Sequence, residues 1–134
     1  MQQQMALVAS EAYIARHGMP KDEDDLKNHF FVGPDSAQSR APFARWLRDI
    51  VPDDAYVFRT TDNRNMQDAI LAGAGIGFVT SQEAARNAAL TEVIPSREEW
   101  SAPLWIVTHV DLHRTSKVQA ILTHLKGFAK DYAA

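Results

Sequence analysis

Hydroxyl, carboxylate and amide side chains follow one another at Thr60, Thr61, Asp62 and Asn63. They come where a strand-like apolar run ends and a helical pattern begins. Such side chains can hydrogen-bond a small ligand, and the N-terminus of a helix favours a negative charge. The same position suits Asp62 as an N-cap that accepts hydrogen bonds from the first backbone N–H groups of the helix. Both roles stay open, and one does not exclude the other.

A second polar group lies in "GPDSAQSR", where Ser36, Ser39 and Arg40 come shortly before Pro42. A loop between a strand and a helix is a position that binding sites of α/β proteins favour. There Arg40 could pair with a carboxylate through two hydrogen bonds. The alternative is an ordinary solvated turn.

A third group is "THVDLHRT", in which His109, Asp111 and His113 alternate. On an extended strand the three side chains would share one face and could bind a metal ion or exchange protons. The alternative is a polar strand end with surface histidines, since two histidines and one aspartate often fall together by chance.

Three glycines in "LAGAGIGFVT" suggest a phosphate-binding loop, but their context argues against it. Such a loop follows a strand and opens a helix. Here the helical pattern comes first, Gly73 stands where a helix ends in a left-handed residue, and Gly75 and Gly77 belong to the strand that follows. We therefore predict a helix-to-strand turn and close backbone packing.

Short apolar runs alternate with helical patterns, which predicts an α/β fold. The expected strands are Met5–Ala9, Phe30–Gly33, Tyr56–Thr60, Gly75–Val79 and Leu104–His109. The expected helices start after Ser10, within "KDEDDL", at Pro42 and near Asp62, and at two capping-box patterns, Thr80 with Glu83 and Ser116 with Gln119. Segment 95–103 is expected to be a loop.

Composition and charge exclude several classes of function. The chain has 134 residues, a formal charge of -3 and no cysteine. Without a basic surplus it should not bind duplex DNA by itself. The absence of cysteine excludes disulfides and thiolate metal sites and suits a reducing cytoplasm. No basic, apolar leader and no apolar run long enough to span a membrane is seen, so we expect a cytoplasmic protein with no membrane partner.

Four stretches together resemble the effector-binding region of LysR-type transcriptional regulators, and the resemblance runs nearly end to end. They are "ALVASEAYIARHGMP", "DLKNHFFVGPDSAQSR", "TTDNRNMQDAILAGAGIGFVTSQEA" and "APLWIVTHVDLHRTSKVQAILTHLKGF". The resemblance implies a lobe like those of type II periplasmic binding proteins, with a mixed, mostly parallel sheet flanked by helices. Residues 8–102 would form the second lobe and 103–134 the returning strand and helix. The helix-turn-helix and first lobe of the family are absent from this sequence.

The resemblance also implies a function. A small-molecule effector, which we expect to be a carboxylate or another small anion, would lie in the cleft between lobes. Thr61 and Asp62 match the polar pair that borders this pocket, and we add Asn63, Ser36, Ser39 and Arg40. Thr80 is a weaker candidate, because the family more often has proline there and the capping box explains this threonine.

No catalysis, cofactor or metal is expected from the resemblance. A homo-oligomer is expected, with DNA contacted only through the missing N-terminal domain. Two alternatives of other classes remain. One is a small metal-dependent hydrolase that uses His109, Asp111 and His113. The other is a self-associating module that uses the apolar face of Ile121, Leu125 and Phe128 on the last helix.

Overall fold

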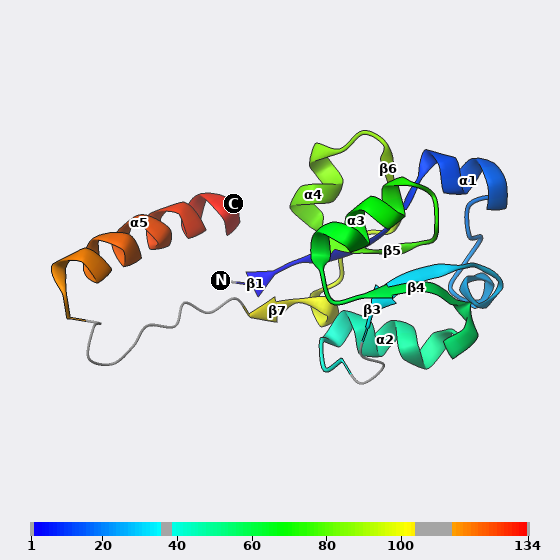
Figure 1. The fold of residues 1–134 in the computed structure, drawn as a ribbon, viewed down its shortest axis with the longest axis horizontal. Coiled ribbons are helices and arrows are strands. Elements are labelled where there is room, and N and C mark those ends of the chain that lie inside the picture. Colours follow the sequence, from blue (N-terminus) through cyan, green and yellow to red (C-terminus); the bar gives the residue numbers. More distant parts are fainter. Residues whose placement is uncertain (1, 36–38, 104–113, 134) are drawn as a thin grey trace. The chain divides into compact units, whose positions relative to one another are not determined.

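The structure is a computed structural model that describes residues 2–35, 39–103 and 114–133 (Figure 1). Two compact units make up the chain, Gln4–Ser101 and the combination of Met1–Gln3 with Ala102–Ala134. With η for 3-10 helices, the elements are β1 (Gln2–Gln3), β2 (Met5–Ser10), α1 (Glu11–His17), η1 (Asp24–Asn28), β3 (Phe31–Pro34), α2 (Pro42–Ile50), η2 (Asp53–Ala55), β4 (Tyr56–Thr60), α3 (Asn63–Leu71), β5 (Gly77–Thr80), α4 (Ser81–Arg86), β6 (Leu90–Ile94), η3 (Glu98–Trp100), β7 (Ala102–Pro103) and α5 (Ser116–Ala133).

The larger unit is built on a mixed sheet. Strand β2 lies between β5 and β6, and β3 pairs with β4. The two pieces join at Ile76, whose N–H donates to Phe30 O at 2.9 Å and whose carbonyl accepts from Val32 N at 2.8 Å. The α/β class and the mixed sheet are thus as predicted.

The expected predominance of parallel pairing needs a correction. Strand β2 is antiparallel to both β5 and β6. Among the described strands of this unit, parallel pairing is confined to β3 with β4 and to the bridge between Phe31 and Ile76. Crossover helices impose one direction on the strands that they connect. Strand β2 opens the unit without a preceding crossover helix, so it can run against its neighbours.

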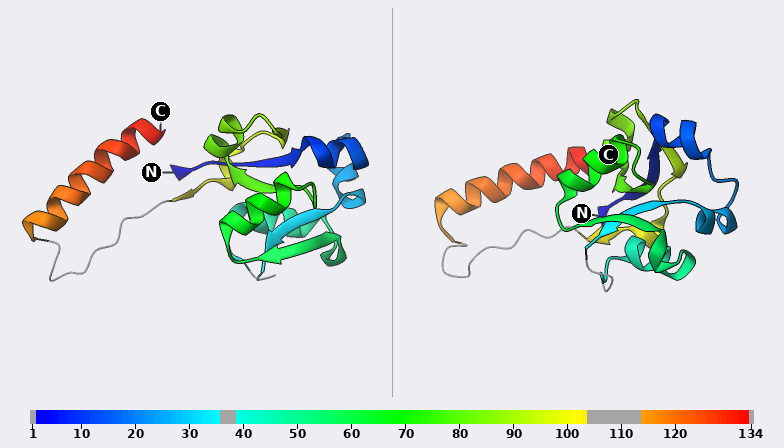
Figure 2. Two further views of the ribbon diagram at one scale, coloured as in Figure 1. Left: turned by 45° about the horizontal axis from the view of Figure 1, so that its top comes forward. Right: turned by 45° about the vertical axis from the view of Figure 1, so that its right-hand side comes forward.

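Helices cover both faces of the sheet (Figure 1 and Figure 2). Every residue of β2 is buried, as expected for a central strand covered on both sides. Met5, Leu7 and Ala9 point into a core shared with α2, whereas Ala6 and Val8 point into a core shared with α3. The helices that follow β3 and β4 therefore lie on opposite faces.

The apolar faces of α2 and α3 follow the helical spacing of their side chains. The side chains spaced for one side of α2, which are Phe43, Trp46, Leu47 and Ile50, belong to or pack against the first core. Met66, Ala69 and Ile70 of α3 do the same for the second core. Segment 95–103, expected as a loop, also holds η3, where Trp100 is fully buried with its ring 4.8 Å from that of Trp46.

Helix starts follow the cap chemistry of the sequence, with one exception. Ser10 Oγ accepts from Tyr13 N at 3.2 Å, and Thr80 and Glu83 form the predicted capping box. Gly73, at φ +83°, has the left-handed conformation predicted for it at the end of α3. The capping box expected at Ser116 is wrong. Ser116 is already helical, and Thr115 Oγ1 accepts from Val118 N, because the helix begins one residue earlier than the pattern suggested.

The capping box of α4 gives a first prediction. Glu83 Oε2 accepts from Thr80 N at 3.0 Å and from Thr80 Oγ1 at 2.9 Å. Glu83→Ala is expected to lower the free energy of unfolding by about 1 kcal/mol, the usual effect of losing a cap. Urea denaturation followed by circular dichroism measures this, with Glu98→Ala at an exposed position as control. Equal losses in the two variants would contradict the role of the box.

Candidate functional site

A cavity of about 360 Å³ opens at the carboxyl ends of β3 and β4. We call it the β3–β4 cavity. It is lined by Met5, Val32, Gly33, Pro34, Asp35, Ser39, Phe43, Ala44, Leu47, Tyr56, Thr60, Thr61, Asn63, Met66 and Phe78. Ligands of open α/β sheets bind in the crevice outside the carboxyl ends of strands, where successive helices leave to opposite faces. Helices α2 and α3 do so here.

Most of the wall is apolar. Five large apolar side chains from both faces of the sheet contribute, namely Met5, Phe43, Leu47, Met66 and Phe78. The rings of Phe43 and Phe78 lie with centroids 5.0 Å apart. An apolar cavity with a few convergent polar groups is the usual form of a small-molecule site.

The polar groups come from the strand ends. In the parallel ladder Pro34 lies opposite Thr60, and Asp35 N donates to Thr60 O at 3.1 Å. This pairing brings Asp35, which follows β3, next to Thr61, which follows β4. Ser39 and Asn63 complete the polar part of the lining.

Three of the predicted site residues, Thr61, Asn63 and Ser39, line the cavity. Asp62 does not. Its Oδ1 accepts from Arg64 N at 2.8 Å and from Asn65 N at 3.1 Å, which makes it the N-cap of α3. Of the two roles left open for Asp62, the structure gives it the capping role.

The other predicted residues lie elsewhere. Arg40 is exposed and is not part of the cavity lining, and Thr80 serves the capping box of α4. Ser36 lies outside the described residues, and so do His109, Asp111 and His113. Within the described part of the chain, no group of three histidine, aspartate or glutamate side chains could hold a metal ion.

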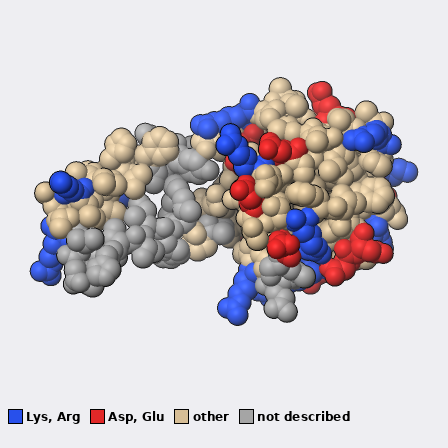
Figure 3. Space-filling model, in the orientation of Figure 1, with Lys and Arg blue, Asp and Glu red and all other residues tan. Residues whose placement is uncertain are grey.

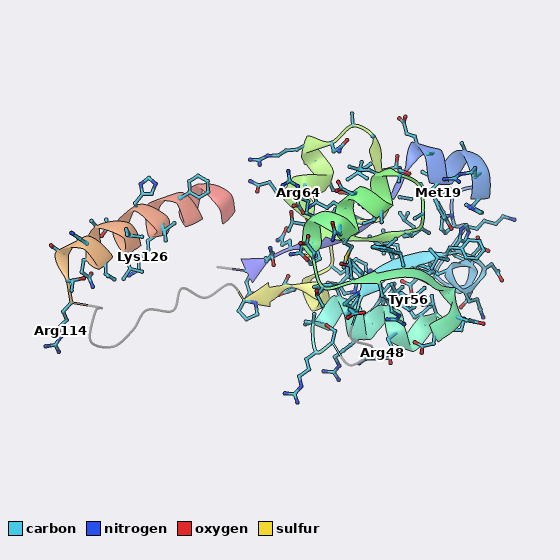
Figure 4. All side chains as sticks on the ribbon, in the orientation of Figure 1. Met19, Arg48, Tyr56, Arg64, Arg114 and Lys126 are labelled. Atoms are coloured by element: carbon cyan, nitrogen blue, oxygen red, sulfur yellow. The ribbon has the colours of Figure 1, made fainter. Side chains whose placement is uncertain are left out.

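Sequence reasoning missed several lining residues. Asp35 could have been found, because it follows β3 as Thr61 follows β4. Tyr56, at the start of β4, lies between that strand and α2 (Figure 4). Burial raises the pKa of its phenol, which is therefore uncharged at neutral pH. Met5 and Phe78 carried no signal beyond that of core residues.

Two arginines, Arg48 and Arg59, lie near Tyr56 but do not line the β3–β4 cavity. The guanidinium of Arg59 stacks over the Tyr56 ring at 4.2 Å, donates to Pro34 O at 3.2 Å and pairs with Asp53 at 2.9 Å. Arg48 Nη1 donates to Ser39 O at 3.2 Å. Together with Asp53 they line a separate, smaller cavity.

Charges of both signs are mixed on one face of the larger unit. On the face of Gln4–Ser101 seen in Figure 3, lysine and arginine side chains are interspersed with acidic ones. An extended stripe of positive charge, which duplex DNA requires, is not formed on this face. Among the helices that the structure describes, none is long and apolar enough to cross a membrane.

Comparison with known proteins gives matches along nearly the whole chain. A family model described as "LysR substrate binding domain" matches residues 1–130. The probable HTH-type transcriptional regulator LtrA of Klebsiella pneumoniae is 27% identical over 127 residues, which are 89% of this chain and 41% of the relative. The chain thus spans less than half the length of that relative.

Solved structures show the same fold. The regulatory domain of CrgA, a LysR-type regulator of Neisseria meningitidis, superposes with a TM-score of 0.67 at 18% identity, covering 93% of this chain and 64% of that one. Full-length AphB, the Vibrio cholerae virulence activator, superposes with a TM-score of 0.59 at 21% identity, covering 95% of this chain and 45% of AphB.

Proposed function

The chain belongs to the family of LysR substrate-binding domains, and we propose that the β3–β4 cavity is where it holds a small-molecule effector. Small-molecule sites of proteins commonly combine an apolar wall with a few hydrogen-bonding groups. The observation that carries the proposal is the meeting of Asp35, Ser39, Thr61 and Asn63 around an apolar cavity at the strand ends.

We extend the proposal to the rest of the regulator. Residues 8–102 would form one lobe, and 103–134 would return the chain to a facing lobe. An effector that contacts both lobes would shift the population of their arrangements. That shift would change how an oligomer presents its DNA-binding domains.

We also propose that the domain senses its effector without transforming it and works in the cytoplasm together with its DNA target. Nucleophilic catalysis would need a nucleophile and a base in hydrogen-bond reach of each other. The hydrogen bonds described around the cavity contain no such pair of side chains.

Thr61 is the residue to test. Thr61→Val keeps the shape of the side chain and removes its hydrogen-bonding group. In a full-length regulator that carries this chain, we expect the effector concentration for half-maximal transcription to rise about 3- to 10-fold, as for a lost hydrogen bond of about 1 kcal/mol. A reporter gene with the regulator's own promoter measures this.

Thr91→Val is the matched control, since Thr91 is half-buried on β6 and does not line the cavity. It should leave the effector response unchanged. Equal shifts in the two variants would remove Thr61 from the binding site.

A further inference from the structure

We infer that the β3–β4 cavity takes an effector with an apolar body and a polar end that donates hydrogen bonds, either a hydroxyl or an ammonium group. The inference rests on the proposed function of this cavity as the effector site. It replaces the carboxylate or small anion that the sequence favours, and three features of the wall support it.

First, the hydrogen-bond donors at the N-terminus of α3 already have partners. The backbone N–H groups of Arg64 and Asn65 both donate to Asp62 Oδ1, and the N–H of Asp62 donates to Thr60 Oγ1 at 3.1 Å. An anion at a helix N-terminus depends on such donors. The carboxylate of Asp62 satisfies them from within the chain, and its own negative charge repels a second anion.

Second, the described lining contains no lysine, arginine or histidine. The arginines beside it have other partners. Arg59 pairs with Asp53 at 2.9 Å and with Pro34 O, and Arg48 donates to Ser39 O. Arg40 is exposed and outside the lining. Transfer of an unpaired anion into an apolar cavity is unfavourable, so this wall disfavours one.

Third, the charged group that does line the cavity is an acid. The carboxylate of Asp35 accepts hydrogen bonds and cannot donate them. Ser39, Thr61 and Asn63 can donate as well as accept. A ligand whose polar end donates to Asp35 gives this carboxylate a hydrogen-bond partner, whereas a carboxylate leaves Asp35 without a donor and adds a like charge beside it.

The body of the ligand follows from the apolar side chains. About 360 Å³ lies near the lower end of the range for small-molecule pockets, roughly 300–1,000 Å³. Phe43, Phe78 and Met66 supply two aromatic rings and a thioether, which pack well against a single ring. A substituted ring fits within this volume and places no charge against the apolar wall.

Three single-ring probes of matched size test the inference: benzyl alcohol, benzylamine, which is protonated at neutral pH, and benzoate. Their dissociation constants are measured on the whole 134-residue chain from NMR shifts of the amides of the lining residues. We expect the alcohol or the amine to bind roughly 3- to 10-fold more tightly than benzoate, from desolvation of the anion and repulsion by Asp35.

Asp35→Asn should reduce the preference over benzoate without abolishing it, because it removes the repulsion at the rim while the cost of desolvating the anion remains. Asp54→Asn, at an exposed aspartate outside the cavity, is the control and should preserve the preference. An amine that binds more tightly than the alcohol, and loses this advantage in Asp35→Asn, identifies the ammonium group as the polar end. An alcohol that binds to the unaltered chain at least as tightly as the amine shows that a positive charge is not required, and identifies the hydroxyl as the polar end.

Benzoate binding as tightly as the alcohol and the amine, or more tightly, would overturn the inference and leave the proposed function standing. Shifts in none of the lining residues with any probe would reject the cavity as a binding site, and the proposed function would fail together with the inference.

Discussion

Gly75→Val is expected to lower the free energy of unfolding by about 3–5 kcal/mol, a large part of the stability of a domain of this size. A Cβ at residue 75 would lie 2.9 Å from the carbonyl carbon of Phe31 and 3.0 Å from Phe30 O. These are backbone atoms, which cannot turn away as the end of a flexible side chain can.

The clash lies where the two parts of the sheet meet. The backbone of Phe30 to Val32 bonds to Ile76, the residue after Gly75, and this bridge joins β3 and β4 to the other strands. Gly75→Val would separate the two pieces at the start of β3. Loss of two backbone hydrogen bonds therefore adds to the cost of the clash.

Denaturation of Gly75→Val by urea or heat, followed by circular dichroism, measures the effect. Gly127→Val is the control, because a Cβ at residue 127 of α5 meets no atom within 4 Å. The control should change stability by less than about 1 kcal/mol. A Gly75→Val chain as stable as the control would show that residue 75 and the start of β3 do not approach as closely as the structure has them.

Ala44→Phe is expected to weaken ligand binding at least tenfold while the chain stays folded. Ala44 lies on α2 with 7% of its surface exposed, and it lines the β3–β4 cavity. A phenyl ring in place of its methyl group would extend into the about 360 Å³ that the ligand needs. Filling an apolar cavity commonly stabilises a fold by about 0.5–2 kcal/mol, so loss of binding would not come from unfolding.

Binding of benzyl alcohol by NMR and the thermal melting curve are measured on the same sample of Ala44→Phe. Ala85→Phe is the control, since Ala85 is exposed on α4 and does not line the cavity. Unchanged affinity in a folded Ala44→Phe chain would place the ligand elsewhere.

Much of the fold could be predicted from the sequence. The predicted strand Tyr56–Thr60 coincides with β4, and the helix starts at Ser10, Pro42, Asp62 and Thr80 are as the patterns indicated. These features depend on hydrogen bonds between residues two or three positions apart and on the period of apolar side chains. The strand expected at Leu104–His109 stays a prediction, outside the described residues.

Strand β6 was not predicted, and its own residues explain why. Thr91 and Glu92 interrupt its apolar residues, and the strand is held through its pairing with β2, where Leu7 lies opposite Ile94. The "KDEDDL" segment likewise forms the short 3-10 helix η1 in place of an α-helix. For β6, contacts distant in the sequence decide the local structure.

The sequence by itself determined the α/β class, the likeness to the LysR family and the polar segment after β4, because periodicity and capping act over a few neighbouring residues. Only the tertiary structure decided which polar residue faces the cavity and which one caps a helix, Thr61 and Asp62 respectively. It also brought Met5, Asp35 and Phe78 to one wall. The physical reason is that such a wall is made by strand pairing between distant segments, and a one-residue change of register would turn every side chain to the other face of the sheet.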